Sequence, residues 1–96
     1  MNSLQTAQAG TLESSDIMIT LSQGLPGSGM KIELESIVMA QYGEAIRRVI
    51  TETVSEQGIA DIYIKAVDRG ALDCTIRART LTALARAGAG PKEAGA

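Results

Sequence analysis

Three short segments of the chain alternate between hydrophobic and polar residues. They span residues 17–22, 30–35 and 61–67, and a shorter, weakly patterned segment at residues 4–10 precedes them. A period of two is typical of a β-strand with one buried face. We therefore predict three strands, and a short edge strand that ends at Gly10. The positions predicted to face the core are Ile17, Ile19, Leu21, Met30, Ile32, Leu34, Ile62, Ile64 and Ala66.

The connection between the first two alternating segments is the clearest loop in the sequence. Residues 23–29 contain three Gly and one Pro, a composition that disfavours both helix and strand. The loop is too long for a two-residue turn, but it suits a longer hairpin connection. We therefore predict that the segments on either side of it form a β-hairpin.

A helical period replaces the alternation between residues 36 and 58. Hydrophobic residues recur there every three or four positions, which is the stripe of an amphipathic helix with one buried face. Ser36 is a suitable N-cap, because its side-chain oxygen can accept an unpaired backbone N–H of the first turn. Gly58 follows the last periodic residue and is predicted to be the C′ glycine. The stripe consists of Val38, Tyr42, Ala45, Ile46, Val49, Ile50, Thr53 and Val54.

Two interpretations are open for residues 72–78. Hydrophobic and polar residues alternate in this stretch, as they do in a strand. The Ala-rich run that follows, with Arg86 near its end and a Gly after it, is instead typical of a helix. We favour a helix over residues 72–87, although this interpretation places Arg79 on the otherwise apolar face.

Together these elements predict a small α+β domain with two layers. A strand, a helix and another strand in succession form a βαβ unit, in which the two strands can be parallel. We expect a mixed sheet of about three to five strands with two helices on one face. The domain is expected to cover residues 1–87, and residues 88–96, rich in Gly and Ala, are expected to form a disordered tail.

Composition and charge argue against several classes of function. The chain has 96 residues and a net charge of −2, without a basic stripe, so binding to nucleic acid is not expected. No apolar run approaches the roughly 20 residues needed to span a bilayer, and the first residues lack the pattern of a signal peptide. We therefore expect a cytoplasmic protein without a membrane partner.

The chain lacks the residues that most often act in catalysis or bind metal. It contains no His, and Cys74 is its only Cys. Because His is the commonest general base and metal ligand, neither a Ser–His nor a Cys–His nucleophile pair can form within the chain. We expect no catalytic residue and no metal site, and we interpret Cys74 as a small core residue.

The residues before the first alternating segment are a candidate functional turn. Glu13, Ser14, Ser15 and Asp16 are all polar, and Ser and Asp side chains readily bond to nearby backbone groups. Ser14 and Ser15 offer the same hydroxyl chemistry, so residue type does not separate them. Glu13 and Asp16 are either solvated turn residues or contacts for a basic partner surface, and Asp16 can also brace the turn.

Two motifs resemble the acyl carrier protein, or gamma subunit, of citrate lyase. The first is GTLESSD at residues 10–16, and the second is DRGALDC at residues 68–74, followed by RAR at residues 77–79. The resemblance extends roughly over residues 7–87. It implies that the chain is a non-catalytic carrier, and that Ser14, with Ser15 less favoured, bears a covalently attached prosthetic group.

The resemblance also implies a cofactor and a set of partners. The cofactor is 2'-(5''-phosphoribosyl)-3'-dephospho-CoA, joined to the serine through a phosphodiester and ending in a thiol. A transferase attaches this arm, and a ligase acetylates its thiol. The alpha subunit then exchanges acetate for citrate. The beta subunit, to which the divalent metal would belong, cleaves the citryl thioester to oxaloacetate and regenerates the acetyl thioester.

Two other functions stay open. The carrier subunit of malonate decarboxylase uses the same kind of arm with a different acid, although the Thr11–Glu13 lead-in and residues 71–74 favour citrate lyase. A protein of another class, a small interaction or regulatory domain, would use both serines only as turn residues. The mass of the intact protein separates this last class from the two carriers.

Overall fold

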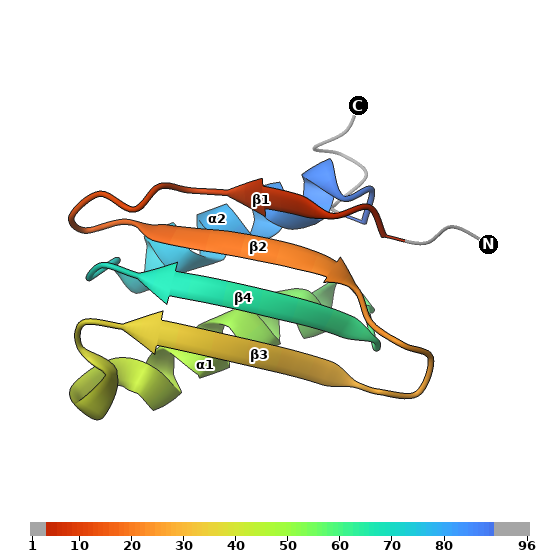
Figure 1. The fold of residues 1–96 in the computed structure, drawn as a ribbon, viewed down its shortest axis with the longest axis horizontal. Helices are drawn as coiled ribbons and strands as arrows, with labels where there is room; N and C mark the ends of the chain where they lie inside the picture. Colours follow the sequence, from red (N-terminus) through yellow and green to blue (C-terminus); the bar gives the residue numbers. More distant parts are fainter. Residues whose placement is uncertain (1–3, 90–96) are drawn as a thin grey trace.

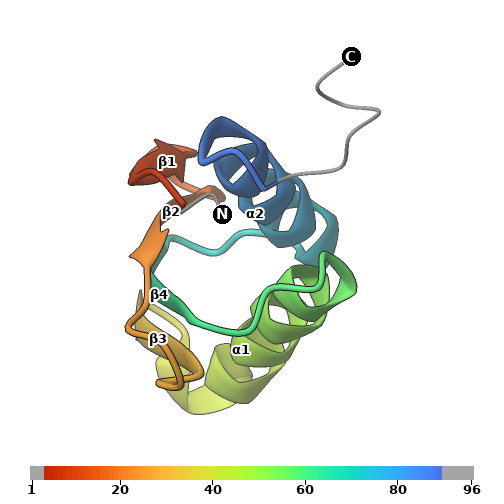
Figure 2. The ribbon, with the colours of Figure 1, turned by 90° about the vertical axis from the view of Figure 1, so that its right-hand side faces the viewer.

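Residues 4–89, which a computed structural model describes, form a sheet covered on one face by two helices. Helices α1 (Met39–Glu56) and α2 (Asp73–Arg86) lie side by side against the same face (Figures 1 and 2). This arrangement confirms the predicted α+β fold, with its mixed sheet and its helices on one face. The tail predicted to be disordered lies, from residue 90, outside the described residues. The strands are β1 (Ala7–Ala9), β2 (Ile17–Gln23), β3 (Met30–Ser36) and β4 (Ile62–Asp68).

The strand order is β1-β2-β4-β3, so β4 lies between β2 and β3. The pairing of β4 is antiparallel with β2 and parallel with β3, to which α1 connects it. The parallel pair confirms the predicted βαβ unit. The hairpin predicted for β2 and β3 is wrong, because these two strands do not pair with each other.

The burial of β4 agrees with its position between β2 and β3. Its inward residues Ile62, Ile64 and Ala66 have no exposed surface, whereas the inward residues of β3 are only partly buried. The loop after β2 passes across the start of β4 and is held there by Asp61. The backbone N–H of Gly24 donates to the Asp61 carbonyl at 3.2 Å, and that of Gly29 donates to its carboxylate at 2.9 Å.

An aliphatic core fills the space between the sheet and the helices. Register places Ile64 of β4 between Leu21 of β2 and Ile32 of β3, so neighbouring strands contribute to one continuous apolar layer. Ile50 of α1 and Ile76 of α2 cover this layer and are fully buried. Within residues 4–89, neither helix combines the length and hydrophobicity needed to cross a membrane.

The helix boundaries correct one prediction and confirm two others. α1 begins at Met39, and its N-cap residue Val38 contributes no side-chain cap, so the N-cap prediction for Ser36 is wrong. Ser36 is instead the last residue of β3. Gly58 has φ +75°, as a C′ glycine requires. Residues 73–78 are helical, in agreement with the favoured interpretation.

The candidate turn lies at the end of the sheet where β3 and β4 finish and β2 begins, at the left of Figure 1. At this end Asp68 is the register partner of both Ile17 on β2 and Ser36 on β3. The loop from residue 10 to residue 16 therefore lies beside the connections from β3 to α1 and from β4 to α2. Segments far apart in sequence meet here.

We expect Gly10→Ala to be far more destabilising than Gly27→Ala. Both glycines have positive φ, +98° and +82°, so alanine is strained by roughly 1–2 kcal/mol at each position. A Cβ at Gly10 would in addition overlap the carbonyl oxygen of Ile17, whereas nothing lies within 4 Å of one at Gly27. Urea unfolding should therefore show a larger loss for Gly10→Ala, by at least about 2 kcal/mol. Equal losses would contradict this packing of the loop.

Candidate functional site

The tip of the loop between β1 and β2 is a tight turn with two exposed serines. The backbone N–H of Asp16 donates to the Glu13 carbonyl at 3.2 Å, so Ser14 and Ser15 occupy the two central positions. Ser15 adopts φ +65°, a left-handed conformation that is uncommon for Ser. In the part of the chain that the structure describes, both serines are exposed and no hydrogen bond engages the Ser14 hydroxyl. That hydroxyl is accessible to an external reagent.

Two backbone hydrogen bonds attach this turn to the residue after β4. The N–H of Ser15 donates to the Arg69 carbonyl, and the N–H of Arg69 donates to the Asp16 carbonyl, each at 2.8 Å. They continue the β2–β4 ladder beyond its last pair, Ile17 with Asp68. The serines therefore sit on an extension of the sheet, which fixes their position relative to residues 69–71.

The carboxylate of Asp16 braces the turn from inside. It accepts hydrogen bonds from the Thr11 hydroxyl at 2.6 Å, from the Ile17 N–H at 2.7 Å, and from two nitrogens of Arg79 at 3.0 Å each. The Arg79 bonds above all, and the Thr11 bond next, lower the pKa of Asp16 from 3.8 to about 2, although burial acts in the opposite direction. Asp16 is 9% exposed. It is a structural brace and not a solvated contact for a partner.

The role of Arg79 in bracing the turn was not predicted from the sequence. Arg79 comes from α2 and forms a bidentate pair with Asp16, 63 positions away in the chain. Its place on an otherwise apolar helix face was the available signal, because a cation there requires a buried partner. Arg77, by contrast, pairs with Glu56 on the exposed surface, as a solvated face predicts.

A second buried carboxylate, Asp68, organises the loop that follows β4. It is 1% exposed and accepts hydrogen bonds from the N–H groups of Gly70 at 3.1 Å and Ala71 at 3.0 Å, and from the Ser36 hydroxyl at 2.8 Å. Ser36 in turn accepts the Val38 N–H at 3.0 Å. Asp68 thus fixes the start of both helical connections. The signal in the sequence was its inward position in the alternation of β4.

The prediction for Cys74 is wrong. Its side chain is exposed, because it is the second residue of α2 and lies away from the buried face that Ile76 and Thr80 define. Ordinary small hydrophobic burial therefore does not account for this Cys.

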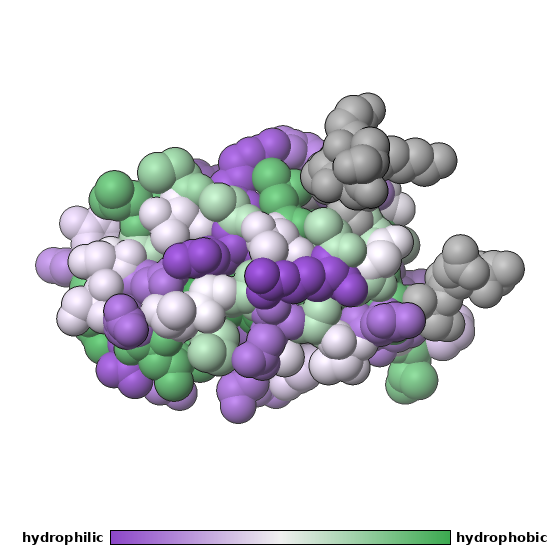
Figure 3. Space-filling model, turned by 90° about the horizontal axis from the view of Figure 1, so that it is seen from above, coloured by the Kyte–Doolittle hydropathy of each residue, from purple (hydrophilic) through white to green (hydrophobic). Residues whose placement is uncertain are grey.

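Exposed hydrophobic side chains gather at the end of the molecule that carries the turn. Figure 3 shows several of them at its left-hand end, beside hydrophilic side chains. Of the six large hydrophobic residues exposed in the described part of the chain, only Leu25 lies at the opposite end. Clusters of this kind mark interaction surfaces in soluble proteins. The exposed hydrophobic residues at the end that carries the turn are Leu12, Ile37, Met39, Tyr42 and Leu72.

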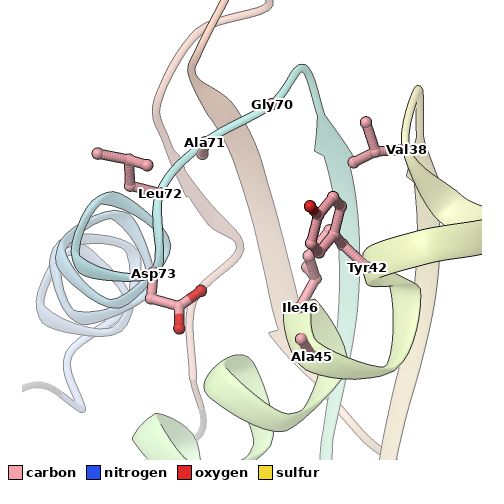
Figure 4. A pocket seen from close by; sticks show the side chains of 8 residues that line it. All are labelled: Val38, Tyr42, Ala45, Ile46, Gly70, Ala71, Leu72 and Asp73. Atoms are coloured by element: carbon pink, nitrogen blue, oxygen red, sulfur yellow. The ribbon is translucent and has the colours of Figure 1, made fainter.

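A groove of about 450 Å³ opens at the same end. Figure 4 shows it between the first turns of α1, which provide Tyr42 and Ile46, and the segment from Gly70 to Asp73. Tyr42 is 55% exposed, since the first turn of α1 extends beyond the core. The prediction that the whole stripe from residue 38 to residue 54 is buried therefore fails at its start.

Comparisons with known proteins agree on the kind of chain this is. The family model described as "Malonate decarboxylase delta subunit (MdcD)", an acyl carrier protein model, matches residues 4–87. The citrate lyase acyl carrier protein of Lactobacillus acidophilus is 57% identical over 82 residues, which are 85% of this chain and 82% of that protein. The citrate lyase acyl carrier protein of Halothermothrix orenii is 51% identical over 89 residues, 93% of each chain.

Solved structures with a similar fold include a malonate decarboxylase. It is a chain of a Pseudomonas malonate decarboxylase hetero-tetramer in complex with malonate, and it matches with a TM-score of 0.74 and 20% sequence identity. The match covers 90% of this chain and 87% of that chain. At this level of identity the likeness is one of fold.

We expect the Asp16–Arg79 pair to contribute to stability at neutral pH and to lose that contribution in acid. The pKa of Asp16 in the folded chain, about 2, lies below the ordinary 3.8, so the stabilisation is complete above pH 3.8 and disappears as the pH falls toward 2. Arg79→Gln should cost about 1–2 kcal/mol at neutral pH, a value that allows for the 40% exposure of the Arg79 side chain.

The matched control is Arg77→Gln, which breaks an exposed pair and should cost less than about 1 kcal/mol. Urea unfolding of both variants and the parent at neutral pH and near pH 2 provides the measurement. If the Arg79→Gln loss were the same at both pH values, the Asp16 carboxylate would not be its source.

Proposed function

This chain belongs to the family of citrate lyase acyl carrier proteins, and from that membership we propose that it is the acyl carrier subunit of a citrate lyase. In this role it is a non-catalytic member of a complex with several subunits. It carries 2'-(5''-phosphoribosyl)-3'-dephospho-CoA on the hydroxyl of Ser14. The observation that supports this proposal most directly is the exposed Ser14 hydroxyl on a turn that is fixed to the sheet.

The site fits a covalent phosphodiester. A hydroxyl at the tip of a braced turn can be reached by a modifying enzyme without unfolding of the domain. The arm would supply a terminal thiol, on which acetyl and then citryl groups are carried as thioesters. The residues of this chain fix the position of the attachment point. The length of the arm, and not motion of the loop, then determines which active sites the terminal thiol can reach.

Charge around the serine is compatible with an added phosphodiester. Asp16 is ionised, but its charge is compensated by the two hydrogen bonds from Arg79. Glu13 and Arg69 are both exposed and of opposite sign. The loop is therefore less negative than the run from Glu13 to Asp16 suggests. Among residues 4–89 Glu13 forms no ion pair, but it is exposed, so solvent and salt screen its repulsion of one further negative charge.

The chain is not equipped to activate Ser14 by itself. It contains no His. The nearest buried carboxylate, Asp16, has a pKa of about 2 and its oxygens are already engaged, so it is a poor proton acceptor. The base that removes the Ser14 proton would come from the attaching transferase.

The exposed hydrophobic residues at this end suit contact with partner subunits. We infer that Leu12 and Ile37, which flank the turn and the α1 connection, approach the alpha and beta subunits when the arm is delivered to each. The acetylating ligase and the transferase would approach the same end, because both act on the arm or its attachment point.

A second candidate is the carrier subunit of malonate decarboxylase. It is favoured by the description of the matching family model and by the fold of the Pseudomonas structure. The identities of 51–57% to citrate lyase carriers, against 20% for that structure, favour citrate lyase.

We expect Ser14→Ala to abolish attachment of the arm without loss of stability, because an exposed hydroxyl contributes little to the fold. The measurement is intact mass and peptide mapping after co-expression with the transferase and its cofactor precursor. Ser15→Gly is the control, since glycine adopts the left-handed conformation of residue 15 more readily than serine. It should load fully and unfold at an equal or slightly higher urea concentration. Loading of Ser14→Ala at Ser15 would reverse the assignment.

The acid that the carrier serves is expected to be citrate. Loaded, acetylated protein mixed with the alpha and beta subunits of a citrate lyase should release oxaloacetate from citrate, and Ser14→Ala should release none. The same loaded protein with the catalytic subunits of a malonate decarboxylase should give no decarboxylation of malonate. The reverse pattern would support the second candidate.

A further inference from the structure

The groove beside the turn has the dimensions and walls of a small-molecule site. Its volume of about 450 Å³ falls within the range of roughly 300–1,000 Å³ that is usual for ligand pockets. Ile46, which is 3% exposed, contributes to its apolar lining with Val38 and Ala45, and the ring of Tyr42 borders it. The carboxylate of Asp73 is the one charged side chain among the residues that line it.

The groove is connected to the serine turn through fixed backbone. Arg69 exchanges two hydrogen bonds of 2.8 Å with Ser15 and Asp16, and the next residue along the chain, Gly70, already lines the groove. Asp68 holds Gly70 and Ala71 in place from beneath. The groove therefore has a set position relative to Ser14.

We propose that this groove binds the adenosine part of the arm carried by Ser14, an inference that rests on the proposed function. The planar, uncharged adenine lies between the Tyr42 ring and the segment Gly70–Ala71 on the opposite side of the groove. Stacking of a base on an aromatic side chain is a favourable and sequence-tolerant contact. Asp73 at the rim accepts a hydrogen bond from the adenine amino group or from a ribose hydroxyl.

The order of groups along the arm selects adenosine over the rest of the cofactor. Counting from the serine, the arm runs through a phosphate and a ribose to the adenosine, and only then through a diphosphate to pantetheine and the thiol. A groove next to the attachment point meets the adenosine first. The diphosphate is too strongly charged for apolar walls. The thiol end must leave the carrier to reach other subunits.

The exposed guanidinium of Arg69 completes the site. Among residues 4–89 it forms no ion pair, and its backbone is hydrogen-bonded to both Ser15 and Asp16. Because its backbone is next to the serine turn and its side chain is exposed, we expect it to pair with the phosphodiester on Ser14 through charge-assisted hydrogen bonds. With phosphate and adenosine both held, only the pantetheine portion moves. This shortens the effective tether and raises the local concentration of the thiol near a docked subunit.

The test uses nuclear magnetic resonance on the loaded and unloaded full-length chain. Loading should shift the amide signals of residues 70–73 and of the start of α1, and adenine ring current should move the signals of the Tyr42 ring and the Ala71 methyl group. Tyr42→Ala should still load, as judged by intact mass, but should lose the shifts at residues 70–73. Leu25→Ala, at the opposite end, should retain all of them.

A titration without the covalent bond tests the groove independently of the proposed function. Dephospho-CoA and adenosine added to Ser14→Ala protein should shift the same groove signals, and binding should weaken at least about fivefold in the Ser14→Ala, Tyr42→Ala double variant. Pantetheine alone should leave them unchanged. An unmodified mass would count against the proposed function and leave this titration valid.

Three results would overturn the groove assignment. The first is loaded protein whose shifts stay within residues 11–16. The second is a groove that responds to pantetheine but not to adenosine. The third is a groove that is unaffected by loading in the isolated chain and becomes protected only when a catalytic subunit is added, which would make it a protein-docking surface.

Discussion

The paired carboxylate of Asp16 is the interaction on which the functional end of the molecule depends. One buried anion joins Thr11 in the loop, Ile17 at the start of β2, and Arg79 on α2. A buried charge is costly unless it is both paired and hydrogen-bonded, so each of these contacts offsets part of the cost of burying Asp16. The turn that presents Ser14 is therefore positioned by the helix layer as well as by the sheet.

Asp68 performs the same task one strand away. It ties the end of β3 to the loop after β4, and that loop supplies both the backbone partner of the turn and one wall of the groove. Asp16 fixes the turn that carries Ser14, and Asp68 fixes the neighbouring residues Gly70 and Ala71. A carrier needs this kind of rigidity because its moving part is the arm. The aliphatic core between the layers supports both carboxylates from below.

The candidate site was only partly predictable from the sequence. The turn chemistry of residues 13–16 and the brace by Asp16 follow from side chains that bond to nearby backbone, which is a local effect. The choice of Ser14 came from the resemblance of a motif, because two adjacent serines are chemically alike. The groove could not be foreseen, since it depends on how far the first turn of α1 extends past the core. The exposure of Cys74 depends on the rotation of α2 about its axis.

The sequence by itself determined the three longer strands and the first helix of this fold, because periods of two and of three to four residues are local properties of the chain. For residues 72–78 it left a strand and a helix both open. It also indicated that β3 and β4 can be parallel, since a strand–helix–strand succession favours this pairing. Only the tertiary structure decided the strand order and the partners of Arg79 and Ser36. These depend on contacts between distant segments, such as the pairing of β4 with both β2 and β3. This strand order places the Asp68 carboxylate next to Ser36. The packing of α2 on the sheet places Arg79 next to Asp16.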